Sequence, residues 1–154
     1  MLFKDDYFFL SNFYPCDVTL NINGNNLTFK NSEAAFQAQK NYELADKFVF
    51  MKGLEAKDYG NKIPITTPNW NKYELFAMAF ALNSKFNNPA LLLKLKSITE
   101  PIQNTNNWYD RYWGICKGEG KDLLGKLLTN IKENNNNLNC LINYIQNDLL
   151  KEIQ

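Results

Sequence analysis

Residues 71–86 read NKYELFAMAFALNSKF, and they strongly favour one kind of structure. On a helix of about 3.6 residues per turn, the apolar side chains of this segment fall on almost every side. Little polar face remains for contact with water. A helix that is apolar nearly all round belongs inside a protein. We therefore predict a core helix over residues 71–86.

The segments around this helix predict a small β element and further helices. Residues 16–29, CDVTLNINGNNLTF, alternate in polarity on both sides of Asn23-Gly24-Asn25, a pattern typical of a β-hairpin. Residues 101–118 are expected to be irregular or extended. Further helices are expected over about 33–41 with Ser32 as cap, 54–59, 89–97 with Asn88 as cap, 121–133 and 138–153. Together these predict one α+β domain over residues 1–154, mostly helical, with its β element near the N-terminus.

Composition and charge exclude several classes of function. The chain has 154 residues, of which 45% are apolar, enough for one core. Its net charge of +1 argues against binding nucleic acid through bulk electrostatics alone, but a single nucleotide or a modified base remains a possible ligand. Histidine is absent, so a Ser-His-Asp hydrolase is excluded, and acid–base work falls to Asp, Glu, Lys, Tyr or Cys.

No membrane span, secretory signal or metal site is expected. The longest apolar stretch, Phe76–Leu82, is far shorter than the roughly 20 residues that a membrane helix needs. Asp5 and Asp6 stand where a signal peptide would be basic. The three cysteines are far apart and lack CxxC spacing, which supports neither a disulfide framework nor zinc. We expect a cytoplasmic protein that uses no metal and no cofactor.

Polar residues stand in apolar surroundings at three places. These are Ser11-Asn12 within FLSNFYP, the helix face of Glu33, Gln37 and Lys40, and Asp110-Arg111 within WYDRYWG. By pattern alone, the helix face is typical of a solvated surface and Asn12 of a turn. The aromatic segment is more typical of a core with a salt bridge than of a stacking platform. Pattern alone therefore names no reaction.

The order of four motifs does indicate a family. FLSNFYP, NSEAAFQAQK, NWNKYELFAMAFALNSKF and DRYWG followed by GEGKDLLGKLL occur in this order. Together they resemble the NADAR family over residues 8–133. SEAAFQAQK is the most specific piece, and the D-x-YWG motif with its glycine-containing loop is second. The chain departs from the family pattern at Ala34-Ala35, at Ile115-Cys116-Lys117 and at Asp122.

The resemblance implies a helical fold with a small sheet and an N-glycosidase that cleaves a bond between ribose C1 and a nitrogen. The first substrate that it implies is a guanine base carrying ADP-ribose, free or in nucleic acid. An alternative substrate is a ribosylamino-pyrimidine phosphate of riboflavin synthesis. A non-catalytic module that binds ADP-ribose is the alternative from another class.

Carried over residue by residue, the resemblance also implies a site. Glu33 and Lys40 become the leading catalytic residues, and Asp110 orients the ribose or assists. The implied substrate-binding positions are Ser11, Asn12, Phe13, Gln37, Trp70, Trp113, Gly114, Gly118 and Gly120. Trp70 or Trp113 would stack on a base, and the amides near Gly118 and Gly120 would receive a phosphate. A lysine patch of Lys117, Lys121, Lys126 and Lys132 would contact a nucleic-acid backbone.

Elementary chemistry agrees with this site. Cleaving an N-glycosidic bond builds positive charge on C1, which a carboxylate stabilises, and negative charge on the base, which a proton donor relieves. A lysine that is partly neutral can instead attack C1 and hold the sugar as an imine. Glu33 and Lys40 would lie about 10 Å apart along a helix, within reach of one sugar. We hypothesise that Lys40 is the nucleophile and that Glu33 handles protons.

Overall fold

The computed structural model describes residues 1–154, and its contacts divide the chain into two units. Residues Asn12–Lys85 form one unit, called here the hairpin unit. Met1–Ser11 and Phe86–Gln154 form the other, called here the C-terminal unit. No helix in the structure combines the length and apolar composition of a membrane span.

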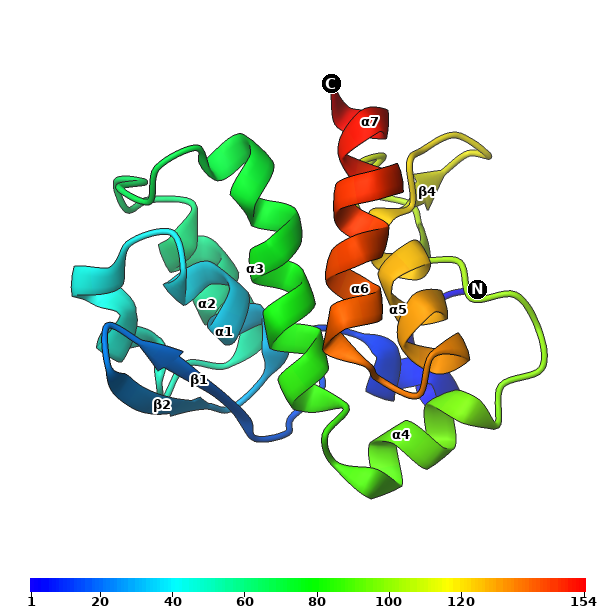
Figure 1. Ribbon diagram of the computed structural model, residues 1–154, viewed down its shortest axis with the longest axis horizontal. Coiled ribbons are helices and arrows are strands. Elements are labelled where there is room, and N and C mark those ends of the chain that lie inside the picture. Colours follow the sequence, from blue (N-terminus) through cyan, green and yellow to red (C-terminus); the bar gives the residue numbers. More distant parts are fainter. The chain divides into compact units, whose positions relative to one another are not determined.

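The hairpin unit places one short helix between a hairpin and two other helices. Strands β1 (Val18–Ile22) and β2 (Asn25–Phe29) pair antiparallel, with Val18 opposite Phe29. Asn23 and Gly24 make the turn with φ of 52° and 82°, the left-handed values that such tight hairpins need. The helices are α1 (Ser32–Ala38), α2 (Gly53–Gly60) and α3 (Trp70–Lys85), with a 3-10 helix at Tyr42–Phe48. Helix α1 contacts α2, α3 and β1 (Figure 1).

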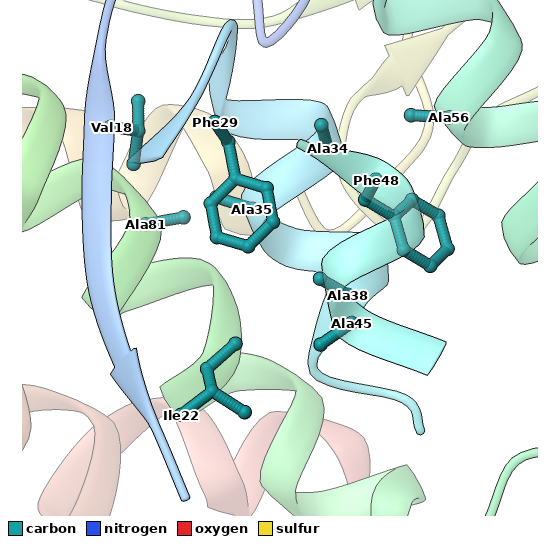
Figure 2. Close-up of a cluster of buried hydrophobic side chains, with 10 residues drawn as sticks. All are labelled: Val18, Ile22, Phe29, Ala34, Ala35, Ala38, Ala45, Phe48, Ala56 and Ala81. Carbon is teal, nitrogen blue, oxygen red and sulfur yellow. The ribbon is translucent and has the colours of Figure 1, made fainter. Parts of the chain in front are cut away.

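The core of this unit is built around small side chains. Figure 2 shows Val18, Ile22, Phe29 and Phe48 gathered with six alanines: Ala34, Ala35, Ala38, Ala45, Ala56 and Ala81. Three of those alanines belong to α1 and are fully buried. Because alanine keeps backbones close, α1 is enclosed by its neighbours and all seven of its residues are buried.

The C-terminal unit is mainly helical. It contains α4 (Pro89–Lys96), α5 (Leu123–Glu133), α6 (Leu138–Tyr144) and α7 (Leu150–Ile153), with a 3-10 helix at Asp5–Leu10. A π-helical segment, Ile145–Leu149, joins α6 to α7. Helix α5 packs against α4 and α6 (Figure 1). A minimal parallel pair joins β3 (Thr105–Asn106) to β4 (Ile115–Cys116), and the connection between them carries the YWG motif.

The predicted fold class is confirmed: the chain is α+β, mostly helical, with its hairpin near the N-terminus. The core helix, the hairpin and the Asn88-capped helix lie where they were predicted. That residues 1–154 form one domain stays a prediction.

Three boundaries differ from the predictions. The cap of α1 is Asn31 rather than Ser32, since the Asn31 side chain accepts the Ala34 N–H at 2.7 Å. Helix α1 ends at Ala38, so Lys40 lies in the following turn. Helix α5 begins at Leu123, because Asp122 adopts a left-handed φ of 52° and caps it from outside.

Candidate functional site

Asn12 fixes the start of α1. Its backbone carbonyl accepts the Glu33 N–H at 3.0 Å, and its side-chain oxygen accepts the Ser32 hydroxyl at 2.8 Å. Its amide nitrogen lies 3.5 Å from the sulfur of Met78 on α3. Asn12 thereby sets the position from which the Glu33 side chain projects.

Glu33, Gln37 and Lys40 are all buried, although the pattern alone favoured a solvated face. Their exposed fractions are 8%, 4% and 8%. Gln37 donates through Nε2 to Glu33 Oε1 at 2.9 Å, while its own Oε1 is buried without a hydrogen-bond partner. Burying polar groups is costly unless they are paired, so the structure tolerates a costly arrangement here.

The Lys40 ammonium is directed toward the end of α2. Lys40 Nζ donates to the Gly60 carbonyl at 3.2 Å. Carbonyls at a helix C-terminus carry partial negative charge, which suits an ammonium. The Lys40 backbone is fixed as well, since its carbonyl accepts the N–H groups of Thr66 and Thr67 at 3.0 and 3.1 Å.

Burial lowers the pKa of Lys40 below its ordinary value, and the charges of Glu33 and Glu74 act in the opposite direction. A buried ammonium loses hydration, which favours the neutral amine. A lysine with a lowered pKa is a better nucleophile near neutral pH, because more of it carries a free electron pair.

Gly60, the last residue of α2, lets the glutamine approach. A β-carbon at this position would lie 2.0 Å from Gln37 Oε1 and 2.5 Å from Gln37 Cδ. Only a glycine leaves the Gln37 amide in its present place. Gly60 therefore serves both site residues, one through its carbonyl and the other through its missing side chain.

Trp70 opens α3 and belongs to a group of aromatic rings. Its ring centroid lies 5.5 Å from that of Phe36 on α1 and 6.2 Å from that of Tyr73. Burial raises the pKa of Tyr73 to about 12, and a hydrogen bond with Tyr42 adds to the shift. Trp70 is half-buried, so part of its indole remains exposed for contact with a ligand.

In the C-terminal unit, Asp110 organises the loop that carries the YWG motif. Its Oδ1 accepts the N–H groups of Tyr112 and Trp113 at 3.1 and 2.9 Å. The buried side chain of Asn106 accepts the Asp110 N–H at 3.1 Å and donates to the Asp110 carbonyl at 2.8 Å. Trp113 is half-buried and meets Tyr112 edge to face at 5.0 Å. The aspartate thus fixes the backbone that positions Trp113.

The glycines of this loop permit close backbone packing. A β-carbon on Gly114 would lie 2.4 Å from the Asn104 carbonyl oxygen, and one on Gly120 would lie 2.1 Å from that of Gly114. Gly118 has a positive φ of 75° in open space. The carboxylate of Asp122 already accepts the Gly125 N–H at 3.3 Å at the start of α5, near where the resemblance places a phosphate.

The structure divides the predicted site residues between the two units. Asn12, Phe13, Glu33, Gln37, Lys40 and Trp70 lie in the hairpin unit, while Ser11, Asp110, Trp113, Gly114, Gly118 and Gly120 lie in the C-terminal unit. Within the hairpin unit, Glu33, Gln37 and Lys40 are directly connected through hydrogen bonds or electrostatic interaction. Phe13 is partly exposed and packs against Gly53. The functional roles of all these residues stay predictions.

The sequence did not identify three residues that contribute to the candidate site or to the YWG loop: Gly60, Glu74 and Asn106. Gly60 follows a predicted helix, where glycine usually signals only a helix end. Glu74 stands in an almost wholly apolar helix, and its isolation there was a signal that could have been used. Asn106 is one of several asparagines before the aromatic segment, and nothing in the sequence distinguishes it from the others.

The chain is similar to two known proteins. The NMR structure of the Escherichia coli protein YbiA matches it with a TM-score of 0.72 and 27% identity, covering 87% of this chain and 81% of YbiA. A riboflavin biosynthesis protein of Vibrio vulnificus (strain YJ016) is 26% identical over 138 residues, which cover 84% of this chain. The match spans only 36% of that longer protein. The model of the NADAR domain matches residues 2–134, and the chain therefore belongs to the NADAR domain family.

Proposed function

We propose that this protein is an N-glycosidase that cleaves the bond between C1 of a ribose and a base nitrogen, with Lys40 as its nucleophile. The observation that carries the proposal is the buried Lys40 amine, whose pKa burial lowers, interacting with the equally buried Glu33. An unreactive surface lysine would have neither property. Family membership supports the same reaction class.

The proposed reaction proceeds through an imine. The neutral Lys40 Nζ attacks C1, and the electron pair of the C1–N bond goes to the base nitrogen, which leaves with a proton. The ribose ring then opens, and its oxygen gains a proton as C1 forms an imine with Nζ. Water adds to C1, the bond to Nζ breaks, and the sugar leaves while Lys40 is restored.

Glu33 is proposed to move the protons and to stabilise positive charge at C1. Its carboxylate is held by the Gln37 amide, which fixes its orientation. A fixed carboxylate stabilises developing positive charge better than solvent does, because it needs no reorganisation. The unpartnered Gln37 Oε1 is suited to accept a ribose hydroxyl, which would satisfy a buried acceptor.

Trp70 and Asp110 are assigned supporting roles. The half-buried Trp70 ring would stack on the base or on an adenine, a contact worth about 1–3 kcal/mol. Asp110 uses Oδ1 to hold the loop of its own unit, and its role toward the ribose stays the one that the family resemblance implies.

The first candidate substrate is a guanine base that carries ADP-ribose. The second is a ribosylamino-pyrimidine phosphate, and the name of the Vibrio vulnificus relative, a riboflavin biosynthesis protein, favours it. A module that only binds ADP-ribose is a third possibility, against which the connected Glu33 and Lys40 argue.

A base-release assay on both substrates tests the proposal. We expect release from one of them, and we expect Lys40→Ala and Glu33→Ala to lose it while keeping the far-UV circular dichroism of the wild type. Borohydride added during turnover should reduce the imine and attach the sugar to Lys40, as seen by peptide mass spectrometry. Release without attachment at Lys40 would refute the nucleophile, and binding of free ADP-ribose without any release would favour the module.

A further inference from the structure

Two large aromatic side chains are exposed in the connection between β3 and β4. Trp108 is 60% exposed and Tyr109 is 61% exposed. They belong to the aromatic segment that the pattern alone favoured as core. Adjacent exposed rings of this size are uncommon on a surface that binds nothing, and they often mark an interaction site.

Two cations accompany the exposed rings. Lys117 Nζ donates to the Tyr109 hydroxyl at 2.8 Å and lies 4.8 Å from the centre of the Tyr109 ring. The Arg111 guanidinium lies 5.6 Å from the same ring. Trp108, Tyr109, Arg111 and Lys117 are called here the aromatic tip.

The counter-charge at the aromatic tip is weak. Glu119 lies 3.8 Å from Arg111, and both side chains are exposed to water. Exposed ion pairs of this kind contribute about 0–1 kcal/mol, so a ligand anion competes with Glu119 easily. The aromatic tip therefore offers two flat rings beside two positive charges.

The loop backbone holds this arrangement in place. Tyr109 has a φ of 66°, a left-handed value that a bulky residue seldom adopts. The buried Asn106 accepts the N–H groups of Trp108 and Asp110 at 3.3 and 3.1 Å, on both sides of Tyr109. On the β4 side, Lys117 and Gly118 form a tight turn with φ of 53° and 75°. The side chains of the aromatic tip are thus presented to solvent by a backbone conformation that costs free energy.

The lysine patch predicted from the sequence is divided in the structure. Lys126 pairs with Glu152 at 2.9 Å, Lys121 donates to the Glu152 carbonyl, and Lys132 donates to the Ile98 carbonyl. Of the four predicted lysines, Lys117 is the one that stands beside the exposed rings.

We propose that the aromatic tip is a binding surface for single-stranded nucleic acid. Bases would stack on Trp108 and Tyr109, while Arg111 and Lys117 would contact the flanking phosphates. Aromatic rings beside cations are what unpaired strands select, because every base has a flat face and every linkage a negative charge. With two cations involved, the electrostatic contribution is small, which agrees with a chain of net charge +1.

The proposal goes beyond the glycosidase reaction, since unmodified strand is a sufficient ligand.

Fluorescence anisotropy with a labelled, unmodified single-stranded oligonucleotide of about 12 residues tests the surface. We expect the wild type to bind, and Trp108→Ala or Tyr109→Ala to weaken binding about 5- to 150-fold. Phe50→Ala is the matched control, because Phe50 is 84% exposed but lies in the hairpin unit. It should bind as the wild type does.

Salt dependence tests the cations separately. Lys117→Ala should reduce the slope of log affinity against log salt by about 0.7, whereas the exposed Lys47→Ala should leave it unchanged. Thermal melting confirms that each variant is folded.

Three results would overturn the inference: no binding by the wild type, unchanged binding by Trp108→Ala, or tighter binding of poly-glutamate with the same dependence on Trp108. The last result would identify an acidic peptide as the partner. Base release is measured independently, so a failure of the glycosidase proposal leaves the strand-binding result readable.

Discussion

Helix α1 and the aromatic tip depart from ordinary burial in opposite directions. All seven residues of α1 are buried, Glu33 and Gln37 among them. The aromatic tip instead exposes Trp108 and Tyr109, which are large enough to help form a core. Both arrangements cost free energy, because polar groups inside and apolar groups outside are each poorly solvated.

The difference between the two regions indicates different kinds of chemistry. Around α1 and the turn that follows it, removal of water strengthens electrostatic interactions and lowers the Lys40 pKa, which suits bond cleavage. At the aromatic tip, water is present and the exposed rings suit reversible stacking. A reaction is therefore expected from the first region and recognition from the second.

The largest expected effect is the loss of turnover in Lys40→Met. Methionine fills a similar volume but has no amine, so we expect kcat to fall at least about 10³-fold. Circular dichroism should show a folded variant, but the free energy of unfolding, measured with urea, should fall, because the buried Glu33 carboxylate loses its positive neighbour.

Lys47→Met is the matched control for that variant, since Lys47 is exposed on the 3-10 helix Tyr42–Phe48. Normal turnover in Lys40→Met would show that the reaction does not depend on the buried amine. The contrast between a region for reaction and a region for recognition would then be wrong.

Glycine substitutions in the loop that carries the aromatic tip should lower the free energy of unfolding by different amounts, depending on how closely the backbone packs at each glycine. Gly120→Ala would place a β-carbon 2.1 Å from a backbone oxygen at a φ of 148°, so we expect it to lower the free energy of unfolding by about 3 kcal/mol. Gly118→Ala has the space and suffers only the left-handed φ of 75°, which costs about 1 kcal/mol. Urea unfolding measures both, and equal losses would mean that the loop relaxes around Gly120.

Much of the fold was predictable because its signals are local. The apolar residues of 71–86 and the Asn23-Gly24 turn each determine their own segment. The burial of α1 was not predictable in this way. Its polar face has the spacing of a surface helix, and what covers it is α2, α3 and the hairpin, all brought in by tertiary packing.

For the aromatic segment the error was the opposite one: the pattern favoured burial, but Trp108 and Tyr109 are exposed. Its composition favours a core, yet the hydrogen bonds of Asn106 and the left-handed φ of Tyr109 turn its first two rings outward. Neither feature has a sequence signature among so many asparagines. For the site, Glu33 and Lys40 were identified by family resemblance, whereas their burial and the contribution of Gly60 required coordinates.

A smaller effect is expected from Gly60→Ala. The added β-carbon would displace the Gln37 amide, which then no longer holds Glu33, so we expect kcat to fall about 10-fold. A double-mutant cycle checks the route: adding Gly60→Ala to Gln37→Ala should cost nothing further. A full additional loss in the double variant would show that Gly60 acts through the Lys40 contact instead.

The smallest expected effect is a shift of the pH–rate profile in Glu74→Gln. Lys40 must lose its proton to attack, so the rate should rise with pH and level off above the Lys40 pKa. The Glu74 carboxylate stabilises the ammonium and thus raises that pKa against the effect of burial. Removing the charge lowers the pKa further, and the rising limb should move to lower pH. Glu43→Gln, on the exposed side of its 3-10 helix, should not move it. An unmoved rising limb would mean that the group that titrates does not feel the charge of Glu74 and is not this buried amine, and the nucleophile would then have to be reassigned.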